Sequence, residues 1–285
     1  MKLIRVGEAG LERPAVLVSE DHFYDVSELG DFNEQFFRGD SLPALSDHVT
    51  TLVRQGKNPE VLGTQRLGAP IGRPHQIVCI GLNYADHAAE TGAEIPSEPI
   101  IFTKPPNTLV GPFDDVRIPP TSVKTDWEVE LAIVIGSQSR YLNNEEEALN
   151  NIAGYMVSND VSEREFQLER QGQWSKGKSA ETFNPAGPWL VTKDEIPNPT
   201  GLGMFLSVNG QTMQNSSTSQ MVYTPAFLVH YLSQFMVLEP GDVINTGTPP
   251  GVGMGLKPPR YLKPGDVMEL GIEGLGTQRQ NLVAS

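Results

Sequence analysis

Two glutamates that lie two positions apart, Glu128 and Glu130, stand in the segment DWEVELAIVIG. If this segment is a β-strand, both side chains point to the same face, because side chains alternate along a strand. The strand continues with apolar residues, of which Ala132 and Val134 lie on the glutamate face. Two adjacent carboxylates in such surroundings repel each other and lose hydration unless they are protonated or neutralised. A bound divalent cation would neutralise them, whereas a strand end in solvent would leave two ordinary surface glutamates.

A third acid, Asp160, ends the apolar segment IAGYMVSND. An aspartate at this place can cap a following helix, or it can complete a metal site. Two glutamates and one aspartate offer only oxygen ligands, which favour Mg²⁺ or Mn²⁺ over Zn²⁺. Three carboxylates would also leave coordination positions for water and for a chelating substrate, as a catalytic site requires.

A histidine and a glutamate, His87 and Glu90, lie three positions apart in GLNYADHAAETG. One helical turn would bring them to the same face. A carboxylate beside an imidazole raises its basicity and fixes its tautomer, which suits a general base that activates water. A solvated pair on a short helix is the alternative, and the other four histidines have no comparable neighbours.

The segment GQWSKGKS, residues 172–179, fits the phosphate-loop pattern G-x-x-x-x-G-K-[ST]. A phosphate loop follows a buried strand and opens a helix. Here the preceding SEREFQLERQ is polar and typical of a helix, and Pro185, Gly187 and Pro188 would interrupt any helix soon after Lys178. We therefore do not expect nucleotide binding, and Lys178 needs another role.

The composition of the chain limits its partners. The 285 residues carry a formal net charge of −14 and no cluster of Lys and Arg, which argues against nucleic acid as a partner. No segment approaches the ~18–20 apolar residues that span a bilayer, so we expect a cytoplasmic protein without a membrane partner. The single cysteine, Cys79, lies in the apolar run QIVCIGL, and we expect it to be buried and unreactive.

Glycine and proline, with 28 and 23 residues, divide the chain into short segments, which favours a mainly β fold with some α-helices. We predict a small N-terminal α+β domain over residues 1–70, in which short strands precede a helix at LPALSDHVTTLVRQG, and a catalytic domain over residues 71–285. Helices are also expected at NEEEALNN, where Asn144 would be the N-cap, and at TPAFLVHYLSQFM. Strands are expected in WEVELAIVIG, IAGYMVSND, AGPWLVT, MFLSVNG, DVINTG and DVMELGIEG.

Several segments occur in an order that resembles the fumarylacetoacetate hydrolase family: NYADHAAE, SEPIIFTKPP, WEVELAIVIG, SNDVSEREFQ, GKSAETFNPAGP and NTGTPPGVG. The resemblance covers about residues 75–275. It implies the mixed β-sandwich roll of this family, preceded by a small N-terminal domain, and a homodimer or higher homo-oligomer. It also implies a Mg²⁺ or Mn²⁺ ion bound by Glu128, Glu130 and Asp160.

The same resemblance implies roles for further residues. Lys178 matches the conserved lysine of the family's K-S segment, which gives this residue the role that a phosphate loop does not. His87 and Glu90 match an H-x-x-E pair that some members carry on a mobile lid. Three more residues match positions that contact the substrate acid or metal-bound oxygens: Arg164, Gln167 and Thr248.

Two positions depart from family members. Leu82 stands where certain acylpyruvate hydrolases carry arginine, and Pro250 stands where they often have lysine. Both changes leave fewer cations for a second carboxylate on the substrate. The C-terminal segment GVGMGLKPPRYLKPGDVMELGIEGLG is most similar to hydrolases of 2,4-diketo-3-deoxy sugar acids of the L-rhamnonate and L-fuconate pathways. The resemblance thus implies a small 2-oxo acid substrate, a 2,4-dioxo acid cleaved at a carbon–carbon bond to pyruvate and a second acid such as lactate.

Two other kinds of function are compatible with these residues. An oxaloacetate-type decarboxylase or a 2-oxo-acid isomerase would use the same metal site and the same stabilisation of an enolate, without an activated water. A non-catalytic protein could bind a small acid on the metal site, but His87, Glu90 and Lys178 would then have no role. Release of pyruvate from any acylpyruvate in the presence of Mg²⁺ would exclude the non-catalytic alternative.

Overall fold

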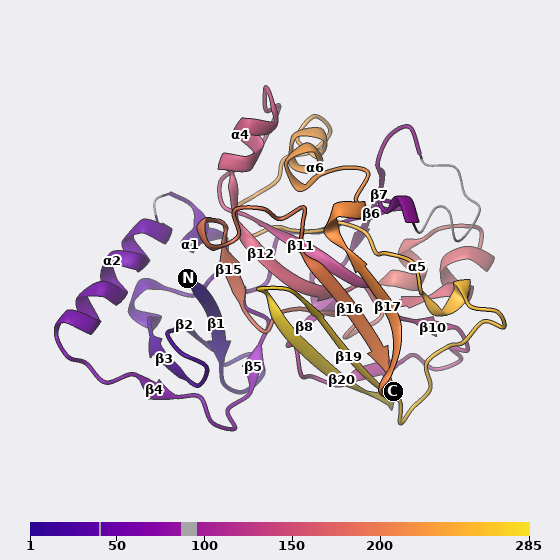
Figure 1. Cartoon of the computed structure of the whole chain (residues 1–285), viewed down its shortest axis with the longest axis horizontal. Coiled ribbons are helices and arrows are strands. Elements are labelled where there is room, and N and C mark those ends of the chain that lie inside the picture. Colours follow the sequence, from indigo (N-terminus) through magenta and orange to yellow (C-terminus); the bar gives the residue numbers. More distant parts are fainter. Residues whose placement is uncertain (40, 87–95) are drawn as a thin grey trace.

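The structure, a computed structural model, describes residues 1–39, 41–86 and 96–285. It is mostly β with a few short helices, which confirms the predicted fold class (Figure 1). Most strands belong to two sheets that pack face to face, and the remaining strands form two short pairs. Within the described ranges, no helix is long and apolar enough to cross a membrane.

The elements before residue 70 extend one edge of the larger sheet and lie at the left of Figure 1. They are β1 (Lys2–Val6), β2 (Arg13–Leu17), β3 (His22–Asp25), η1 (Ser27–Leu29), α1 (Glu34–Phe37), α2 (Ser41–Arg54), β4 (Glu60–Val61) and β5 (Leu67–Gly68). The helix expected after the short strands is α2. Strand β1 pairs with β2, with β5 and also with β15 (Leu190–Thr192), so the N-terminal strands join the sheet of the remaining chain. A domain boundary near residue 70 stays a prediction.

The larger sheet has the strand order β4-β3-β2-β1-β15-β12-β11-β18-β6-β7, with β5 paired to β1 outside this path. Its remaining strands are β6 (Ile77–Gly81), β7 (Ile100–Lys104), β11 (Val129–Ile135), β12 (Ile152–Asn159) and β18 (Val243–Asn245). Strand β18 lies between β11 and β6, antiparallel to the former and parallel to the latter. Segments that are far apart in the chain therefore meet in the interior of this sheet.

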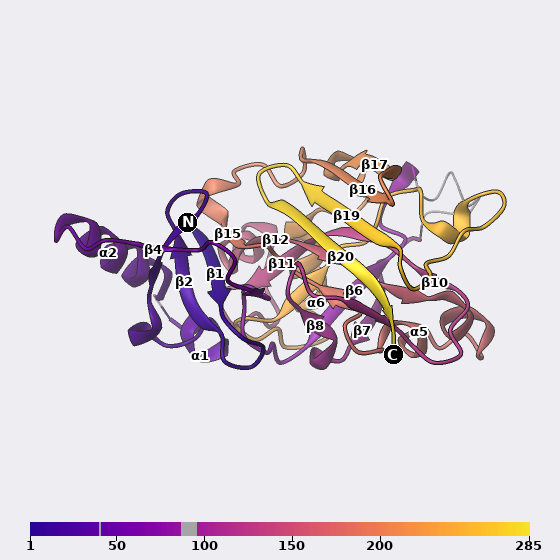
Figure 2. The same ribbon diagram turned by 90° about the horizontal axis from the view of Figure 1, so that it is seen from below.

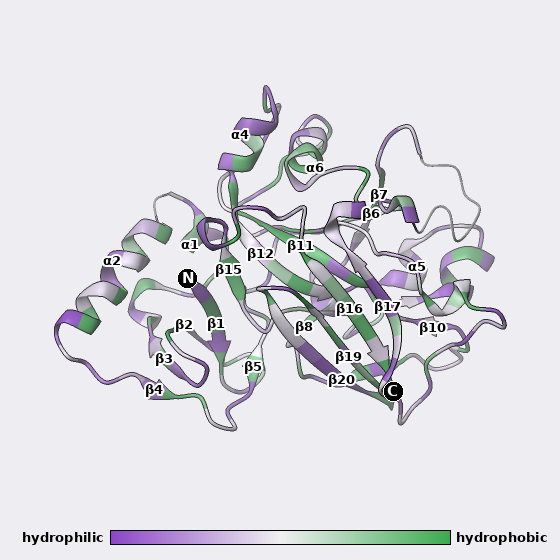
Figure 3. Ribbon diagram, viewed as in Figure 1, coloured by the Kyte–Doolittle hydropathy of each residue, from purple (hydrophilic) through white to green (hydrophobic). Residues whose placement is uncertain are grey.

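The second sheet covers one face of the larger one (Figure 2). Its strands, in spatial order, are β17 (Gln211–Ser217), β16 (Gly203–Val208), β19 (Val267–Ile272), β20 (Gly276–Ala284) and β9 (Val116–Ile118). Leu131 and Ile133 of β11 pack with Leu206 of β16 and Leu270 of β19 in one buried cluster. Figure 3 shows the hydrophobic residues gathered on these facing strands. The main core therefore lies between the two sheets.

The short pairs and helices complete the structure. The pairs are β8 (Leu109–Val110) with β14 (Asn184–Pro185) and β10 (Thr125–Asp126) with β13 (Ser162–Glu163). The helical elements are η2 (Pro106–Thr108), α4 (Glu145–Asn150), the π-helix η3 (Glu165–Glu169), α5 (Ser175–Lys178), η4 (Lys193–Glu195), η5 (Thr218–Gln220), α6 (Pro225–Leu232) and η6 (Gly253–Gly255). Both α-helices expected after residue 140, α4 and α6, are present. Asn144 is the N-cap of α4, since its side chain accepts a hydrogen bond from the Glu147 amide at 2.9 Å.

Candidate metal centre

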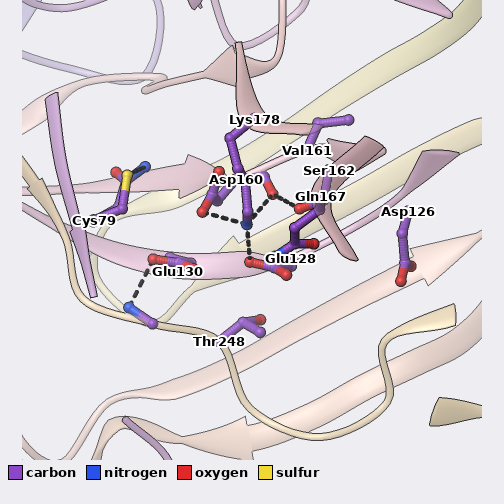
Figure 4. A network of polar contacts seen from close by, with 12 residues as sticks. Cys79, Asp126, Glu128, Glu130, Asp160, Val161, Ser162, Gln167, Lys178 and Thr248 are labelled. Atoms are coloured by element: carbon purple, nitrogen blue, oxygen red, sulfur yellow. Dashed lines mark hydrogen bonds and ion pairs between the residues drawn. The ribbon is translucent and has the colours of Figure 1, made fainter. Parts of the chain in front are cut away.

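The antiparallel pair β11–β12 brings the three carboxylates together. Glu130 lies on β11, opposite Ser158 of β12, and Glu128 directly precedes β11. Asp160 follows the last residue of β12, and its backbone amide donates a hydrogen bond to the Glu128 carbonyl at 2.9 Å. One carboxylate oxygen from each of the three acids lies within 4.8 Å of the others. Sheet register thus places Glu128, Glu130 and Asp160 around one point (Figure 4).

All three acids are buried, with exposed fractions of 7% for Glu128, 1% for Glu130 and 0% for Asp160. Glu130 shares a strand face with Ala132 and Val134, as the sequence predicted, and these two belong to the hydrophobic cluster beneath α1. Burial excludes the alternative of two glutamates on a solvated strand end. It also means that the charges must be compensated inside the protein.

Two lysines supply part of that compensation. The Lys178 ammonium lies 2.9 Å from Oε2 of Glu128 and 2.7 Å from Oδ2 of Asp160, between the two carboxylates in Figure 4. The Lys104 ammonium contacts Oδ1 of Asp160 and donates a hydrogen bond to the Val161 carbonyl at 3.0 Å. Asp160 therefore has a lysine on each carboxylate oxygen, and its side chain caps no helix.

Lys178 reaches the carboxylates because it ends the short helix α5, which packs against η3 and β13. The chain before this helix is the π-helix η3 and a turn, where a phosphate loop would need a strand. The Lys178 ammonium also lies 5.0 Å from the ring centroid of Phe102, within cation–π distance. The structure thus directs Lys178 into the carboxylate site.

An arginine links the site to a fourth acid. Arg164 contacts Oε1 of Glu128 through Nη1 at 2.7 Å and Oδ2 of Asp126 through Nε at 2.8 Å. Asp126 is fully buried and accepts further hydrogen bonds from the amides of Trp127, Gly253 and Met254. Among the described residues, Nη2 of Arg164 has no hydrogen-bond partner. Nη2 is a buried hydrogen-bond donor that the described residues leave unused.

The electrostatic surroundings shift the pKa values of the two glutamates in opposite directions. Burial alone would raise the pKa of Glu128, but the nearby charges of Lys178 and Arg164 lower it to about 2. Burial raises the pKa of Glu130 well above its ordinary value, and the charges of Asp160 and Glu128 raise it further. Burial also lowers the pKa of Lys104, against the opposing charge of Asp160. Of the two glutamates, Glu130 therefore has the surroundings that favour the protonated form.

The residues present fit a divalent cation. Among the described residues, Glu130 contacts no cationic side chain, and its Oε2 accepts a hydrogen bond only from the Gly247 amide, at 2.7 Å. Each oxygen of Glu128 and Asp160 meets one cation and keeps a second lone pair for a ligand. A buried set of three carboxylates with one uncompensated member, made only of oxygen donors, suits Mg²⁺ or Mn²⁺.

The three predicted substrate-binding residues, Arg164, Gln167 and Thr248, line the same small cavity as Glu128, Glu130 and Lys178. The volume of this cavity is about 120 Å³. Gln167 accepts a hydrogen bond from Nη1 of Arg164 at 3.0 Å. The Thr248 hydroxyl donates to the Val129 carbonyl at 2.9 Å and accepts from the side-chain amide of Gln214 at 2.8 Å. The apolar residues that line the cavity are Ile80, Leu82, Phe102, Leu168, Trp174 and Met254. Substrate contacts by Arg164, Gln167 and Thr248 stay predictions.

The predicted water-activating pair cannot be placed. His87 and Glu90 both lie outside the described residues. Their role as a general base therefore stays a prediction.

Sequence reasoning missed two members of the cluster, Lys104 and Asp126. Lys104 stands in SEPIIFTKPP, a segment that carried the family resemblance, but nothing in its local pattern indicates that it contacts Asp160, 56 residues away. Asp126 opens DWEVELAIVIG and belongs to β10, so a strand pattern read through this segment gives it no partner. A charged residue next to a buried strand end was the available signal in both cases.

The fold and the acidic site together define an enzyme family. The family model "Fumarylacetoacetate (FAA) hydrolase C-terminal" matches residues 76–283, so the chain belongs to the fumarylacetoacetate hydrolase family. A fumarylacetoacetate hydrolase from Exiguobacterium antarcticum superimposes with a TM-score of 0.84 at 35% identity, over 100% of both chains. The predicted family and its fold are confirmed.

Other relatives differ in their reactions. A maleylpyruvate hydrolase from Sphingobium sp. SYK-6, solved with manganese(II) and pyruvate, has a TM-score of 0.82 at 26% identity over 100% of both chains. A 2-hydroxyhepta-2,4-diene-1,7-dioate isomerase from Mycobacterium marinum has a TM-score of 0.78 at 31% identity, over 100% of this chain and 99% of that one. A relative from Burkholderia multivorans is 50% identical over 281 residues, 98% of each chain, and its provisional hydrolase name gives no substrate.

Proposed function

We propose that this protein is a divalent-metal-dependent hydrolase that cleaves a carbon–carbon bond in a 2,4-dioxo acid, releasing pyruvate and a second acid. The observation that carries the proposal is the buried set of Glu128, Glu130 and Asp160 with the Lys178 ammonium between two of them. Mg²⁺ or Mn²⁺ would be held by the three carboxylates and would supply Lewis acidity toward a chelating 2-oxo acid. The manganese and pyruvate in the Sphingobium hydrolase support this proposal.

The charges of the centre favour a substrate with one negative charge. The charged side chains that ion pairs connect in the centre, together with Glu130, are Lys104, Asp126, Glu128, Glu130, Asp160, Arg164 and Lys178. With all seven ionised, four acids face three bases, and the sum is −1. A divalent cation would bring the net charge of these groups to about +1. A monoanionic 2-oxo acid would restore neutrality, whereas a dianion would overshoot it.

The apolar residues that line the cavity also favour a substrate with one negative charge. Leu82, which stands where certain acylpyruvate hydrolases carry arginine, lines the cavity beside Phe102 and Trp174. Among the described residues that line this cavity, the cations are Arg164 and Lys178. A second carboxylate at the far end of the substrate would find no partner there. The substrates would be short monoanions such as 2,4-diketo-3-deoxy-L-rhamnonate or 2,4-diketo-3-deoxy-L-fuconate, which would give pyruvate and lactate.

The chain's own residues would divide the reaction as follows. Nη2 of Arg164 would bind the substrate carboxylate, and Gln167 would fix the orientation of the guanidinium. His87, paired with Glu90, would remove a proton from water as it attacks the C4 carbonyl carbon. The C3–C4 bond then breaks, its electron pair passes to the pyruvate part, and C4 becomes the carboxyl carbon of the second acid. Lys178 would stabilise the enolate, which takes up a proton at C3 to give pyruvate.

A second candidate function is isomerisation or decarboxylation of a 2-oxo acid. The buried carboxylates and Lys178 would serve an enolate without any water base, and the Mycobacterium marinum isomerase has the same fold. Both reactions would spare His87 and Glu90, which separates them from hydrolysis.

A panel assay would test these alternatives. Exhaustively chelated protein, with and without added Mn²⁺ or Mg²⁺, is incubated with acetylpyruvate, the two 2,4-diketo-3-deoxy sugar acids, maleylpyruvate, oxaloacetate and 2-hydroxyhepta-2,4-diene-1,7-dioate. We expect metal-dependent pyruvate release from the monoanionic dioxo acids, at least about tenfold faster than from maleylpyruvate. Full activity without metal, or turnover of only oxaloacetate or the diene, would reject the proposed hydrolysis.

A further inference from the structure

Lys104 is a buried lysine that the proposed reaction does not use. It ends β7, and its exposed fraction is 2%. Among the described residues, its ammonium contacts the Asp160 carboxylate and the Val161 carbonyl. Lys104 is not among the described residues that line the cavity, so it would act through Asp160 and not by touching the substrate.

Asp160 keeps its position by other means as well. Its Oδ2 contacts Lys178 at 2.7 Å, its backbone amide donates to the Glu128 carbonyl, and its carbonyl accepts a hydrogen bond from the Ser162 hydroxyl at 2.8 Å. These contacts orient Asp160 whether or not Lys104 is charged. The contribution that is specific to Lys104 is therefore a positive charge, buried where screening by salt is weak.

We propose that Lys104 is an electrostatic positioning residue that weakens the binding of the divalent cation and strengthens the binding of a monoanionic acid to the loaded centre. The inference rests on the proposed metal site and on the proposed substrate class. The charge of Lys104 repels a cation held by Asp160 and attracts an anion in the adjacent cavity. Without that charge the loaded centre would be neutral and not positive, so a monoanion would lose its electrostatic attraction.

A role in packing alone would give a different result. If Lys104 merely filled space or held Asp160 in place, its loss would weaken metal binding and acid binding together, since both need an oriented Asp160. A charge role moves the two affinities in opposite directions. This opposition is the signature that separates the two explanations.

The experiment uses Lys104→Met and Lys104→Gln in the full chain. Met removes charge and hydrogen bond while keeping similar volume, whereas Gln keeps a donor that can reach Asp160. Mn²⁺ binding to the metal-free proteins and pyruvate binding to the Mn²⁺-loaded proteins are measured by calorimetry. We expect both variants to bind Mn²⁺ about tenfold more tightly, and pyruvate about tenfold more weakly, than the unmodified protein.

Arg5→Met serves as the matched control. Arg5 lies on β1, in the N-terminal part of the sheet, and forms an ion pair with Asp31. The substitution therefore removes a partly buried cation that is remote from the carboxylate site. We expect this variant to be less stable but unchanged in both affinities. If Lys104→Met fails to fold without Mn²⁺, Lys104→Gln decides the question.

The outcomes separate the inference from the proposed metal site. Mn²⁺ binding by the unmodified protein, with equal or weaker binding by both Lys104 variants, would overturn the inference and leave the metal site standing. Pyruvate affinity that is unchanged in both variants would overturn it as well. Absence of Mn²⁺ binding by the unmodified protein would overturn both.

Discussion

Two clusters of ion pairs, one near the N-terminal strands and one at the metal centre, use similar residues in different ways. The N-terminal cluster consists of Arg5, Glu12, Asp31, Arg66 and Asp114. Arg5 contacts both oxygens of Asp31, at 2.7 and 3.0 Å, and Arg66 contacts both oxygens of Asp114, at 2.7 and 2.6 Å. Each aspartate is thus held by a planar fork. These side chains are partly exposed, so water supplies the rest of the compensation.

The metal centre has no such closed pairs around its carboxylates. Lys104 and Lys178 are point charges on Asp160, and Glu130 meets no cationic side chain among the described residues. The centre is also more deeply buried than the N-terminal cluster. Each oxygen of Asp31, Asp114, Glu128 and Asp160 meets one cationic nitrogen, so these contacts alone do not separate the two clusters. The difference lies in Glu130, a buried carboxylate with no cationic partner among the described residues. Incomplete compensation, more than acidity, therefore distinguishes the candidate metal centre.

Removal of the uncompensated carboxylate should have the largest effect. Glu130→Gln preserves shape and the hydrogen bond from Gly247 while removing the charge that the cation needs. We expect metal-dependent activity to fall by at least about 10³-fold, beyond the loss of a single charge-stabilising donor. Calorimetry should show that Mn²⁺ binding is lost. The melting temperature of the metal-free protein should not fall below the unmodified value, because glutamine keeps the size of the side chain and removes a carboxylate whose charge burial disfavours.

The water base should come next in effect. His87→Ala should reduce hydrolysis of a 2,4-dioxo acid by about 10²–10⁴-fold, the usual contribution of one general base. Any decarboxylation of oxaloacetate should fall much less, because the carboxylates and Lys178 remain. Both rates are measured on protein with confirmed metal content. Hydrolysis at the unmodified rate would show that His87 is not the base.

Lys178→Met complements His87→Ala, because both variants are compared in hydrolysis and in decarboxylation. It should weaken hydrolysis and decarboxylation alike, by about 10²–10³-fold, since both reactions pass through the pyruvate enolate. A loss confined to hydrolysis would contradict a role in enolate stabilisation. The kinetics of both substrates decide this, again with metal content measured directly.

The N-terminal cluster should affect stability and not chemistry. Arg66→Met removes the partner of Asp114 and of the partly buried Glu12, and we expect the free energy of unfolding to fall by about 1–3 kcal/mol. Denaturant unfolding measures this value. Activity per folded molecule should not change, and a large loss of activity would break the distinction between the two clusters.

The smallest effect concerns Cys79. Burial raises the pKa of its thiol well above the ordinary value, and the charge of Asp160 raises it further. The thiolate is therefore scarce at neutral and mildly alkaline pH. We expect Ellman's reagent to label Cys79 only after unfolding. Rapid labelling of the native protein at pH 8 would contradict the burial of this residue.

The local part of the site could be predicted from the sequence. Alternation along β11 placed Glu128 and Glu130 together, and the end of β12 indicated Asp160. Lys178 could be separated from a phosphate loop by the polar and proline-rich segments on its two sides. These inferences depend only on residues that are close in sequence. There, the alternation of apolar and polar residues and the local composition indicate the secondary structure.

The rest depends on pairings that no local pattern contains. Lys104 meets Asp160 only because β7 lies beyond β6 in a sheet assembled from distant segments. Strands of two residues, such as β10 and β14, have no period to detect. The N-terminal strands look like a separate unit in sequence, yet β1 pairs with β15, so that Lys2 lies opposite Val191. Sheet order, and not strand identity, was the missing information.

The place of β18 between β11 and β6 has a consequence for synthesis of the protein. Until residues 243–245 leave the ribosome, β11 and β6 have no strand between them, and each presents an unpaired edge. Gly247, whose amide donates a hydrogen bond to Glu130, is synthesised at the same late stage. The nascent chain therefore carries the acids long before it can enclose them. Such distant pairing makes folding slow and leaves the growing chain open to association with its neighbours.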